Sequence, residues 1–421
     1  MLTQLRLKNF KNFKDAEIHL GKFTLLIGTN ASGKSNLREA FRFLHGISRG
    51  YNLAEILGEK YSESGILQWR GIRGGTREVT FQAENSFTLD ASCLIQQGTS
   101  ELESSYRIEL NLDSPDKTPY IVNEKLTNLF EARTTIDSGH QSLIVTVLDH
   151  PVLNRPIPFI PSQPVVSQLA ELATNLPIQG EALVPATSIR GKAKATLETF
   201  HSMRFLDLNP DAMRIPSLPG QTTLGDRGEN LSSVVQSICV EPQGKQALIQ
   251  WLQELTPMDV VDFDFPTDFT GKILLTLIEG TGQKISAISA SDGILRFLAI
   301  IAALLVSKPN QLYFFEELDN GIHPTRLNLL IQFIEHQVNQ KNIQVVATTH
   351  SPQLLRLLSQ QSLESACLTY RLPDRLDAKI KRLLDIPDAQ RLIEEQDLAR
   401  LHESGWLEDA VYFLEEEETV V

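Results

Sequence analysis

The sequence has 421 residues, of which 42% are hydrophobic, and a formal net charge of −13 at pH 7. This length suggests two or three domains or one large composite domain, and the acidic balance argues against a nucleic-acid binder that works by overall basicity. Three cysteines without a C-x-x-C pair argue against a zinc site or a disulfide framework, and they favour a reducing compartment.

Membrane and export signals are not evident in the chain. The N-terminus lacks the apolar core of a signal peptide, and the longest apolar run, 297–306, is too short to cross a bilayer. We therefore expect a cytoplasmic protein that is not inserted in a membrane. Local basic clusters such as Lys8, Lys11 and Lys14 are interpreted as solvated faces, and DNA is kept as an alternative partner.

The first elements expected along the chain are strands. Residues 2–7 and 16–20 alternate apolar and polar side chains, as half-buried strands do, and the apolar run 23–27 predicts a third strand. Residues 28–35 follow directly and match G-x-x-x-x-G-K-[ST] at every fixed position, and a helix is expected over about 36–44. The order strand, glycine-rich loop, helix predicts a phosphate-binding loop.

This loop is suited to a polyphosphate. Its glycines let successive backbone N–H groups face one anion, while Lys34 reaches the β- and γ-phosphates and Ser35 offers a hydroxyl to Mg²⁺. An ordinary glycine-rich turn is the alternative, against which the flanking strand and helix argue. The residues expected to hold ATP here are Asn30, Ala31, Ser32, Gly33, Lys34, Ser35 and Asn36.

The middle of the chain predicts a lobe and an arm. Strand patterns at 78–82, 87–95 and 106–112 predict an antiparallel β lobe that flanks the nucleotide site. Prolines then accumulate before helical stretches at 165–173 and 192–201, which predicts an inserted, mostly helical arm. The expected domains are 1–123 for the N-terminal part of the head, 124–203 for the arm, 204–375 for the C-terminal part of the head, and 376–421 for a helical tail.

A second motif precedes the apolar helix expected over 294–306. Residues 288–293 read Ile-Ser-Ala-Ser-Asp-Gly, so hydroxyls and a glycine stand at a helix N-terminus, which suits an anion, although an ordinary helix cap is the alternative. With the phosphate loop, this stretch resembles the signature of ABC-type ATPases in the S-D-G-x-x-R form of the RecF/SMC-like and overcoming-lysogenisation-defect-like group of predicted ATPases. Transporters usually carry L-S-G-G-Q instead.

Two carboxylates end the next apolar strand, 312–315. Successive strand residues face opposite sides, so Glu316 and Glu317 can have different tasks. The resemblance implies that Glu316 supports Mg²⁺ through water and that Glu317 orients or deprotonates the attacking water. The family usually has Asp at the first position, so Glu316 is a departure, and a merely charged strand end is the alternative.

Residues 318–324 follow directly and are similar to the E-N-G-L-H-P element that serves as the D-loop in these ATPases. The resemblance makes Asp319 and Asn320 candidates for contact with a second subunit. A metal-ligand role for His323 is disfavoured, because no second His or Cys stands nearby in the sequence.

The last motif is a strand expected over 344–349, which ends at His350. A histidine at this place matches the switch histidine of the family and is expected to sense the γ-phosphate. The glutamine of the Q-loop is not located, and its candidates are Gln68, Gln96 and Gln97.

The resemblance implies an α/β fold, namely a P-loop, ABC-type ATPase head with an antiparallel β lobe and an inserted arm, acting as a head-to-head homodimer. Signature residues of one subunit would complete the ATP site of the other, with Mg²⁺ bound there; they are Ser289, Ser291, Asp292 and Gly293. We expect an ATPase that drives a DNA-maintenance or anti-phage assembly with a separate nuclease or effector.

Three alternatives remain at this point. One is a nucleotide-gated binding module with negligible turnover, which the departure at Glu316 keeps open. A transporter ATPase subunit is disfavoured by the missing L-S-G-G-Q and by the long stretch between the two halves of the site. A self-contained nuclease is disfavoured because the chain after His350 is short and holds no D-x-D cluster.

Overall fold

The structure is a computed structural model that describes residues 1–97, 100–112, 118–137, 140–147, 157–171, 186–372 and 375–386. These residues form two compact units, each assembled from segments that are distant in sequence. We call them the loop unit, which contains the phosphate loop, and the carboxylate unit, which contains Glu316 and Glu317. The loop unit comprises Met1–Leu20, Gly28–Met203 and Cys367–Arg382, and the carboxylate unit comprises Gly21–Ile27, Arg204–Ala366 and 383–386.

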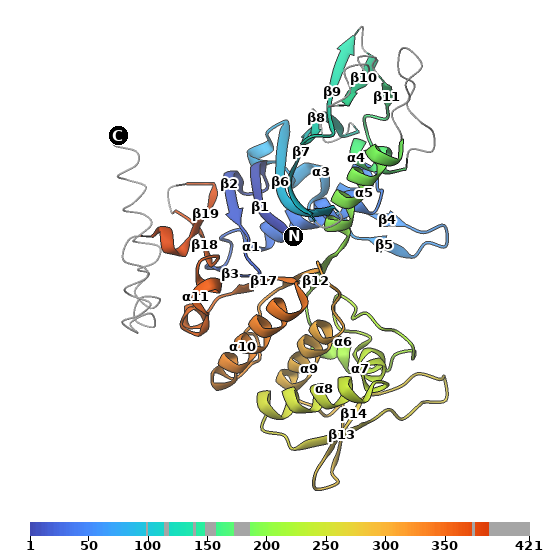
Figure 1. Ribbon diagram of the computed structural model, residues 1–421, viewed down its shortest axis with the longest axis vertical. Coiled ribbons are helices and arrows are strands. Elements are labelled where there is room, and N and C mark those ends of the chain that lie inside the picture. The colour runs from blue at the N-terminus through green and yellow to red at the C-terminus, as the bar shows by residue number, and fades with distance from the viewer. Residues whose placement is uncertain are drawn as a thin grey trace. The chain divides into compact units, whose positions relative to one another are not determined.

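An eight-stranded antiparallel sheet forms the body of the loop unit, in the order β11-β10-β9-β8-β7-β6-β1-β2 (Figure 1). In β1, Leu5 and Leu7 are fully buried while Arg6 between them is exposed, so one face of the strand lies on a core. The strands are β1 (Leu2–Phe10), β2 (Phe13–His19), β6 (Ser86–Gln97), β7 (Ser100–Asn111), β8 (Tyr120–Leu126), β9 (Phe130–Asp137), β10 (His140–Val147) and β11 (Ile157–Phe159).

Two long helices pack in this unit, α1 (Lys34–Ser48) and α5 (Ala186–His201), which contact each other. The rings of Phe43 in α1 and Phe87 in β6 meet edge to face with centroids 5.5 Å apart, which ties α1 to the sheet. The remaining elements are α2 (Leu53–Leu57), α3 (Gly75–Glu78), a 3₁₀ turn (Phe81–Ala83), α4 (Val165–Ala170), and the hairpins β4 (Lys60–Tyr61) with β5 (Leu67–Trp69) and β18 (Cys367–Arg371) with β19 (Ala378–Arg382).

Parallel strands form the centre of the carboxylate unit. Strand β17 (Gln344–Thr349) pairs in parallel with β16 (Leu312–Phe315) on one side and with β3 (Phe23–Ile27) on the other. Every residue of these three strands is buried, as is usual for parallel strands that are covered on both faces. Strand β12 (Met203–Leu206) lies beside β16 in the sheet order.

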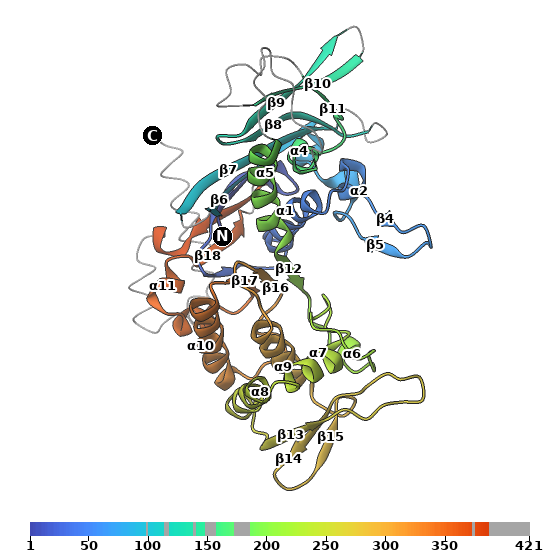
Figure 2. The ribbon, with the colours of Figure 1, turned by 45° about the vertical axis from the view of Figure 1, so that its right-hand side comes forward.

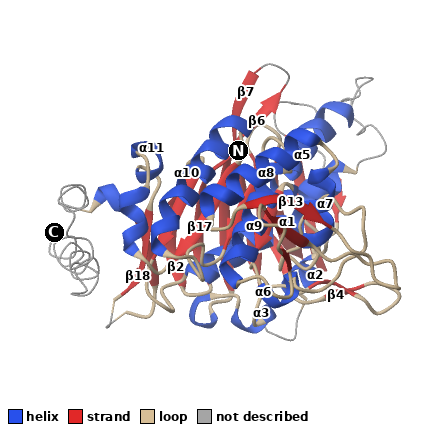
Figure 3. Cartoon of the chain, turned by 90° about the horizontal axis from the view of Figure 1, so that it is seen from below, coloured by secondary structure: helices blue, strands red, loops and turns tan. Residues whose placement is uncertain are grey.

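Helices α8 (Pro242–Leu255), α9 (Asp292–Leu305) and α10 (Pro324–Lys341) contact one another in this unit (Figure 1), and α10 also contacts β17 (Figure 3). In the part of the chain that the structure describes, no helix is long and apolar enough to cross a membrane. A small antiparallel sheet is visible in Figure 2. Its strands and the remaining helical elements are β13 (Val260–Asp264), β14 (Thr276–Glu279), β15 (Lys284–Ser286), α6 (Pro210–Met213), α7 (Leu231–Cys239), α11 (Gln360–Leu363) and 3₁₀ turns at Pro352–Leu357 and Leu383–Asp385.

The α/β fold class is confirmed, but residues 78–82 do not form the expected strand. Helix α3 ends at Glu78, and a 3₁₀ turn follows. Gly74 and Gly75 have φ angles of 77° and 55°, and Gln82 has 47°. These left-handed backbone angles turn the chain where a strand would need extended residues.

The stretch 124–203 is also not mostly helical in its first part, because the end of β8 and strands β9, β10 and β11 lie there before α4 and α5. Asn128, with φ 57°, makes the turn between β8 and β9, so these strands continue the antiparallel sheet beyond β7. The domain boundaries themselves stay predictions.

The expected helical tail is wrong at its start. Residues 378–382 form β19, which pairs antiparallel with β18, for example Leu368 opposite Lys381. Pairing with a neighbouring strand outweighs the local helical pattern there. The rest of the expected tail, from residue 387, lies outside the described residues.

Candidate nucleotide-binding and hydrolysis site

The ends of β3, β16 and β17 meet at one edge of the parallel strands. Ile27 is the last residue of β3 and is opposite Thr349, while Phe315 ends β16 and is opposite Ala347. Because Gly28 follows Ile27 in the chain, the phosphate loop begins at the edge at which the two glutamates and His350 also follow their strands. The carboxyl edge of parallel strands is the usual place for a ligand in α/β proteins.

Lys34 lies at the centre of the phosphate loop. Its side chain is only 7% exposed, and its ammonium donates to the carbonyl oxygens of Gly28 at 2.5 Å and Thr29 at 2.8 Å. The positive charge is therefore held against the loop backbone, where a phosphate would need it. The tip of the loop, by contrast, is exposed at Thr29, Asn30 and Ala31.

Both fixed glycines of the loop are required by close packing. A Cβ at Gly28 would overlap the carbonyl oxygen of Thr369. Gly33 has a φ of 115°, and a Cβ there would lie 2.7 Å from the ring of Phe13. The hydroxyl of Ser32, which is buried, lies 2.9 Å from that of Thr369. Sequence reasoning missed Thr369, because no local pattern connects it with a loop 337 positions away.

The start of α1 suits an anion. No side chain caps this helix N-terminus, and its first turn holds no acidic residue, so the positive end of the helix dipole is not compensated by the chain's own side chains. Asn36 in the first turn donates from Nδ2 to Oδ1 of Asn12 at 2.8 Å, which orients its amide. The uncapped helix end, the buried ammonium and the two tight glycines fit a polyphosphate.

Two oxygen side chains are available for a metal ion. Ser35 offers a hydroxyl and Glu316 a carboxylate, which are the hard donors that Mg²⁺ prefers, and both residues are half-buried. The described residues contain no group of three or more His, Cys, Asp or Glu that could hold a metal ion by themselves. Mg²⁺ typically combines one or two carboxylates with substrate phosphates, so the chemistry of each donor, Ser35 in the loop unit and Glu316 in the carboxylate unit, suits Mg²⁺ that arrives with a nucleotide.

Glu317 has an unusual backbone conformation. Its φ is 49°, in the left-handed region that non-glycine residues seldom adopt. The backbone N–H of Glu317 donates to the hydroxyl of Thr348 at 2.9 Å, and the amide of Asn320 donates to its Oε2 at 2.9 Å. Neighbouring residues thus hold both the backbone and the carboxylate of Glu317 in place.

His350 faces this carboxylate at a longer distance. Its Nε2 lies 3.9 Å from Oε1 of Glu317, beyond a hydrogen bond, and the two side chains are 40% and 53% exposed. Beside them the hydroxyl of Thr349 donates to Oδ1 of Asp319 at 2.8 Å. The two threonines that end β17 therefore position the loop after β16. Sequence reasoning missed this role, although Thr348 and Thr349 directly precede His350 in the chain.

The signature stretch is the N-terminus of α9. Ser291 is its N-cap, and the Ser291 hydroxyl accepts from the N–H of Ile294 at 3.4 Å, while Ser289 and Asp292 are exposed. Gly293 lies against the turn after β16, since a Cβ there would be 2.7 Å from the carbonyl oxygen of Gly321. The signature helix and the expected D-loop are thus packed together within the carboxylate unit.

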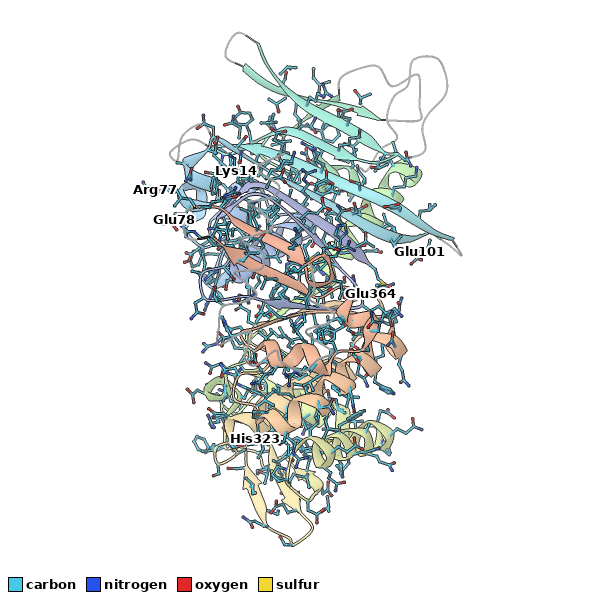
Figure 4. All side chains as sticks on the ribbon, turned by 90° about the vertical axis from the view of Figure 1, so that its left-hand side faces the viewer. Lys14, Arg77, Glu78, Glu101, His323 and Glu364 are labelled. Atoms are coloured by element: carbon cyan, nitrogen blue, oxygen red, sulfur yellow. The ribbon has the colours of Figure 1, made fainter. Side chains whose placement is uncertain are left out.

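His323 caps the N-terminus of α10. Its Nδ1 lies 2.9 Å from the hydroxyl of Thr325 and accepts from the Thr325 N–H at 3.4 Å, and Figure 4 labels it. The Q-loop glutamine stays unassigned. Gln68 is exposed in β5, and the side chains of Gln96 and Gln97 lie outside the described residues.

Two family models match the chain. One, described as "AAA ATPase domain", matches residues 1–141, and the other, described as "AAA domain, putative AbiEii toxin, Type IV TA system", matches residues 188–356. The range 1–141 contains the phosphate loop. The range 188–356 contains the signature stretch, Glu316, Glu317 and His350.

A curated relative from Helicobacter pylori, named ATP/GTP phosphatase, is 25% identical over 376 residues, which cover 86% of this chain and 88% of the relative. A solved SMC head bound to the C-winged helix domain of ScpA aligns with a TM-score of 0.49 at 13% identity, over 90% of this chain and 97% of that chain. An SMC head from Pyrococcus furiosus gives 0.48 at 12% identity, over 94% and 98%. The chain is thus similar to AAA ATPase domains over residues 1–141 and to AAA domains over residues 188–356, and it is similar to a relative named for phosphatase activity on ATP and GTP.

Proposed function

We propose that the chain binds ATP with Mg²⁺ on the phosphate loop and hydrolyses it with the residues that end β16 and β17. The observation that carries this proposal is the strand register, which brings Glu316, Glu317 and His350 to the edge from which Gly28 begins the loop. In this assignment Lys34 supplies a positive charge to the phosphates. Backbone N–H groups and polar side chains surround them, and these belong to Asn30, Ala31, Ser32, Gly33 and Asn36.

Ser35 and Glu316 would each offer an oxygen donor to Mg²⁺, and the chemistry that the ion supplies when bound is neutralisation of phosphate charge. Glu317 accepts a proton from the attacking water, whose oxygen bonds to the γ-phosphorus while the bond to the ADP oxygen breaks. His350 donates a hydrogen bond to the γ-phosphate and so responds to its presence. The left-handed backbone at Glu317 supports this assignment, because such strain is concentrated at functional sites.

The active form we propose is a homodimer of heads with ATP between them. Ser289, Ser291, Asp292 and Gly293 of one copy then complete the site on the phosphate loop of the other. The exposure of Ser289, Ser291 and Asp292 supports this arrangement, because a signature that acts on a second copy must be accessible. Two-fold symmetry gives two identical sites per dimer.

The work of this ATPase is, we propose, to drive a DNA-maintenance or anti-phage defence assembly with a separate nuclease or effector. The family description that names a toxin–antitoxin system supports a defence role. The name of the relative from Helicobacter pylori supports hydrolysis and adds GTP as a second nucleotide to test. A regulatory module with negligible turnover is the second candidate, because Glu316 has a longer side chain than the usual Asp.

Replacing Glu317 by Gln tests the hydrolytic assignment. We expect ATP binding to remain and kcat to fall by about 100-fold or more, because loss of a general base typically costs that much. ATPase assays measure the turnover, and fluorescent-nucleotide titration measures binding. Glu364→Gln, an exposed carboxylate of the same unit that Figure 4 labels, is the control and should hydrolyse ATP normally. Unchanged hydrolysis by Glu317→Gln would remove Glu317 from its role.

A further inference from the structure

The signature of this chain carries an acidic residue where phosphates are expected. Asp292 is the first residue of α9, and its side chain is 63% exposed. A carboxylate at a helix N-terminus stabilises the helix, but the same charge repels an incoming polyphosphate. A helix end that binds ATP therefore needs a group that neutralises Asp292.

Arg214 is placed to do this. Its Nη2 donates to Oδ1 of Asp292 at 2.6 Å and to the backbone carbonyl oxygen of Ala290 at 3.0 Å. These two partners are the residues on either side of Ser291 in the chain. One guanidinium thus neutralises the side chain that follows the signature serine and holds the backbone carbonyl that precedes it.

The position of Arg214 is itself fixed by the fold. Arg214 is the C-cap residue directly after the short helix α6. This helix contacts α9, and the side chain of Asn209 caps its N-terminus by accepting from the N–H of Ala212. The N–H of Asn209 donates to the carbonyl oxygen of Arg227 at 3.1 Å, which ties the start of α6 to a neighbouring segment. Arg214 also pairs with Asp211, but that carboxylate is 91% exposed, so this second pair is screened by water.

We propose that Arg214 is a positioning residue of the composite ATP site, which neutralises Asp292 and orients Ser291 toward the ATP of a second copy. This inference rests on the proposed dimer, in which the signature acts in trans. It assigns a role to a residue that lies outside every recognised motif, more than 70 positions before the signature.

Arg214→Met is the main variant. We expect nucleotide binding by its own phosphate loop to stay at the wild-type level, and ATP-dependent turnover to fall by about 10-fold or more, because a charge-assisted pair is lost and Asp292 is left facing the phosphates. Adding Asp292→Asn should restore part of this loss, whereas damage that is only structural would not be reversed. Asp211→Asn removes the other partner of Arg214 and should hydrolyse ATP normally.

Mixing two inactive variants then tests whether Arg214 acts through the signature of its own copy. Mixing Arg214→Met with Lys34→Ala should restore turnover, because the heterodimer keeps one intact loop facing one intact signature, while mixing Arg214→Met with Ser291→Arg should not. Wild-type turnover by Arg214→Met alone, or rescue by Ser291→Arg instead of Lys34→Ala, would overturn the proposal. If Arg214→Met does not fold, Arg214→Gln, which keeps a donor for the Ala290 carbonyl, enters the same test.

Mixing Lys34→Ala with Ser291→Arg tests the composite site separately from the role of Arg214. If this pair shows no rescue, the proposed composite site is wrong. If it is rescued but Arg214→Met or Arg214→Gln with Lys34→Ala is not, the composite site stands and only the role of Arg214 fails.

Discussion

At the scale of single residues, Glu124 is a buried acid in the loop unit outside the candidate site. Its side chain is fully buried, and it accepts hydrogen bonds from the N–H groups of Val165 and Val166 and from the hydroxyl of Tyr106. Burial raises the pKa of Glu124 from 4.5 to about 7, although these three hydrogen bonds oppose the shift. Between pH 4.5 and about 7, Glu124 is therefore protonated in the folded state and ionised in the unfolded state, so folding takes up a proton.

This residue predicts a pH dependence of stability. The pKa of Glu124 is higher in the folded than in the unfolded state, so its contribution to stability is largest below pH 4.5 and is lost as pH rises to about 7. The loss is on the order of 3 kcal/mol in the free energy of unfolding. Urea unfolding at pH 5 and pH 8 should show a smaller pH dependence for Glu124→Gln than for wild type. Equal dependence in both proteins would contradict the assignment.

Two glycines predict opposite results for the same substitution. Gly28→Ala should destabilise the protein by about 1–3 kcal/mol and weaken ATP binding, because the new Cβ overlaps the Thr369 carbonyl oxygen. Gly191→Ala, in the middle of α5 with open space around its Cα, should stabilise the protein by about 0.5–1 kcal/mol. Thermal unfolding compares the two variants, and a shift of the same sign in both would show that local packing is not the cause.

At the scale of elements, the end of β17 determines how the end of β16 is presented. The hydroxyl of Thr348 accepts from the N–H of Glu317, and the carbonyl oxygen of Thr348 accepts from the N–H of Leu318 at 2.9 Å. Thr348→Val keeps the shape and the carbonyl but removes the hydroxyl. We expect kcat to fall by about 10-fold with unchanged nucleotide affinity, because a positioning hydrogen bond is lost. A loss of affinity without a change in kcat would contradict this role.

The elements also show how far the sequence predicts the fold. The strands expected at 23–27, 312–315 and 344–349 agree with β3, β16 and β17, because their apolar runs and flanking motifs are local signals. The expectations at 78–82 and 378–382 fail, because left-handed turn residues decide the first and pairing with β18 decides the second.

The candidate site divides in the same way. Lys34, Glu317 and His350 stand in motifs that can be read along the chain. Thr369 and Arg214 cannot be found in this way, because each reaches its partner through the tertiary fold, with 337 positions between Thr369 and Ser32 and 78 between Arg214 and Asp292.

At the level of the assembly, the proposed active form contains two copies of the chain. The N-terminus of α9 and the turn after β16 are packed together through Gly293 and Gly321, so in the proposed dimer a change at Glu317 after hydrolysis would reach the surface that faces the second copy. ATP would then hold the dimer, and hydrolysis would release it, because a ligand that binds only the dimer shifts the equilibrium toward it. The proposed effector would then respond to whether the two heads are associated or separated.

The most direct test of this central claim is the ATPase activity of mixed variants. Lys34→Ala lacks a working phosphate loop and Ser291→Arg lacks a working signature, so each protein alone should be inactive. An equal mixture should recover about a quarter of wild-type turnover, because half of the dimers are heterodimers and each has one intact site of two. A mixture that forms heterodimers but stays as inactive as its components would contradict a site shared between two copies.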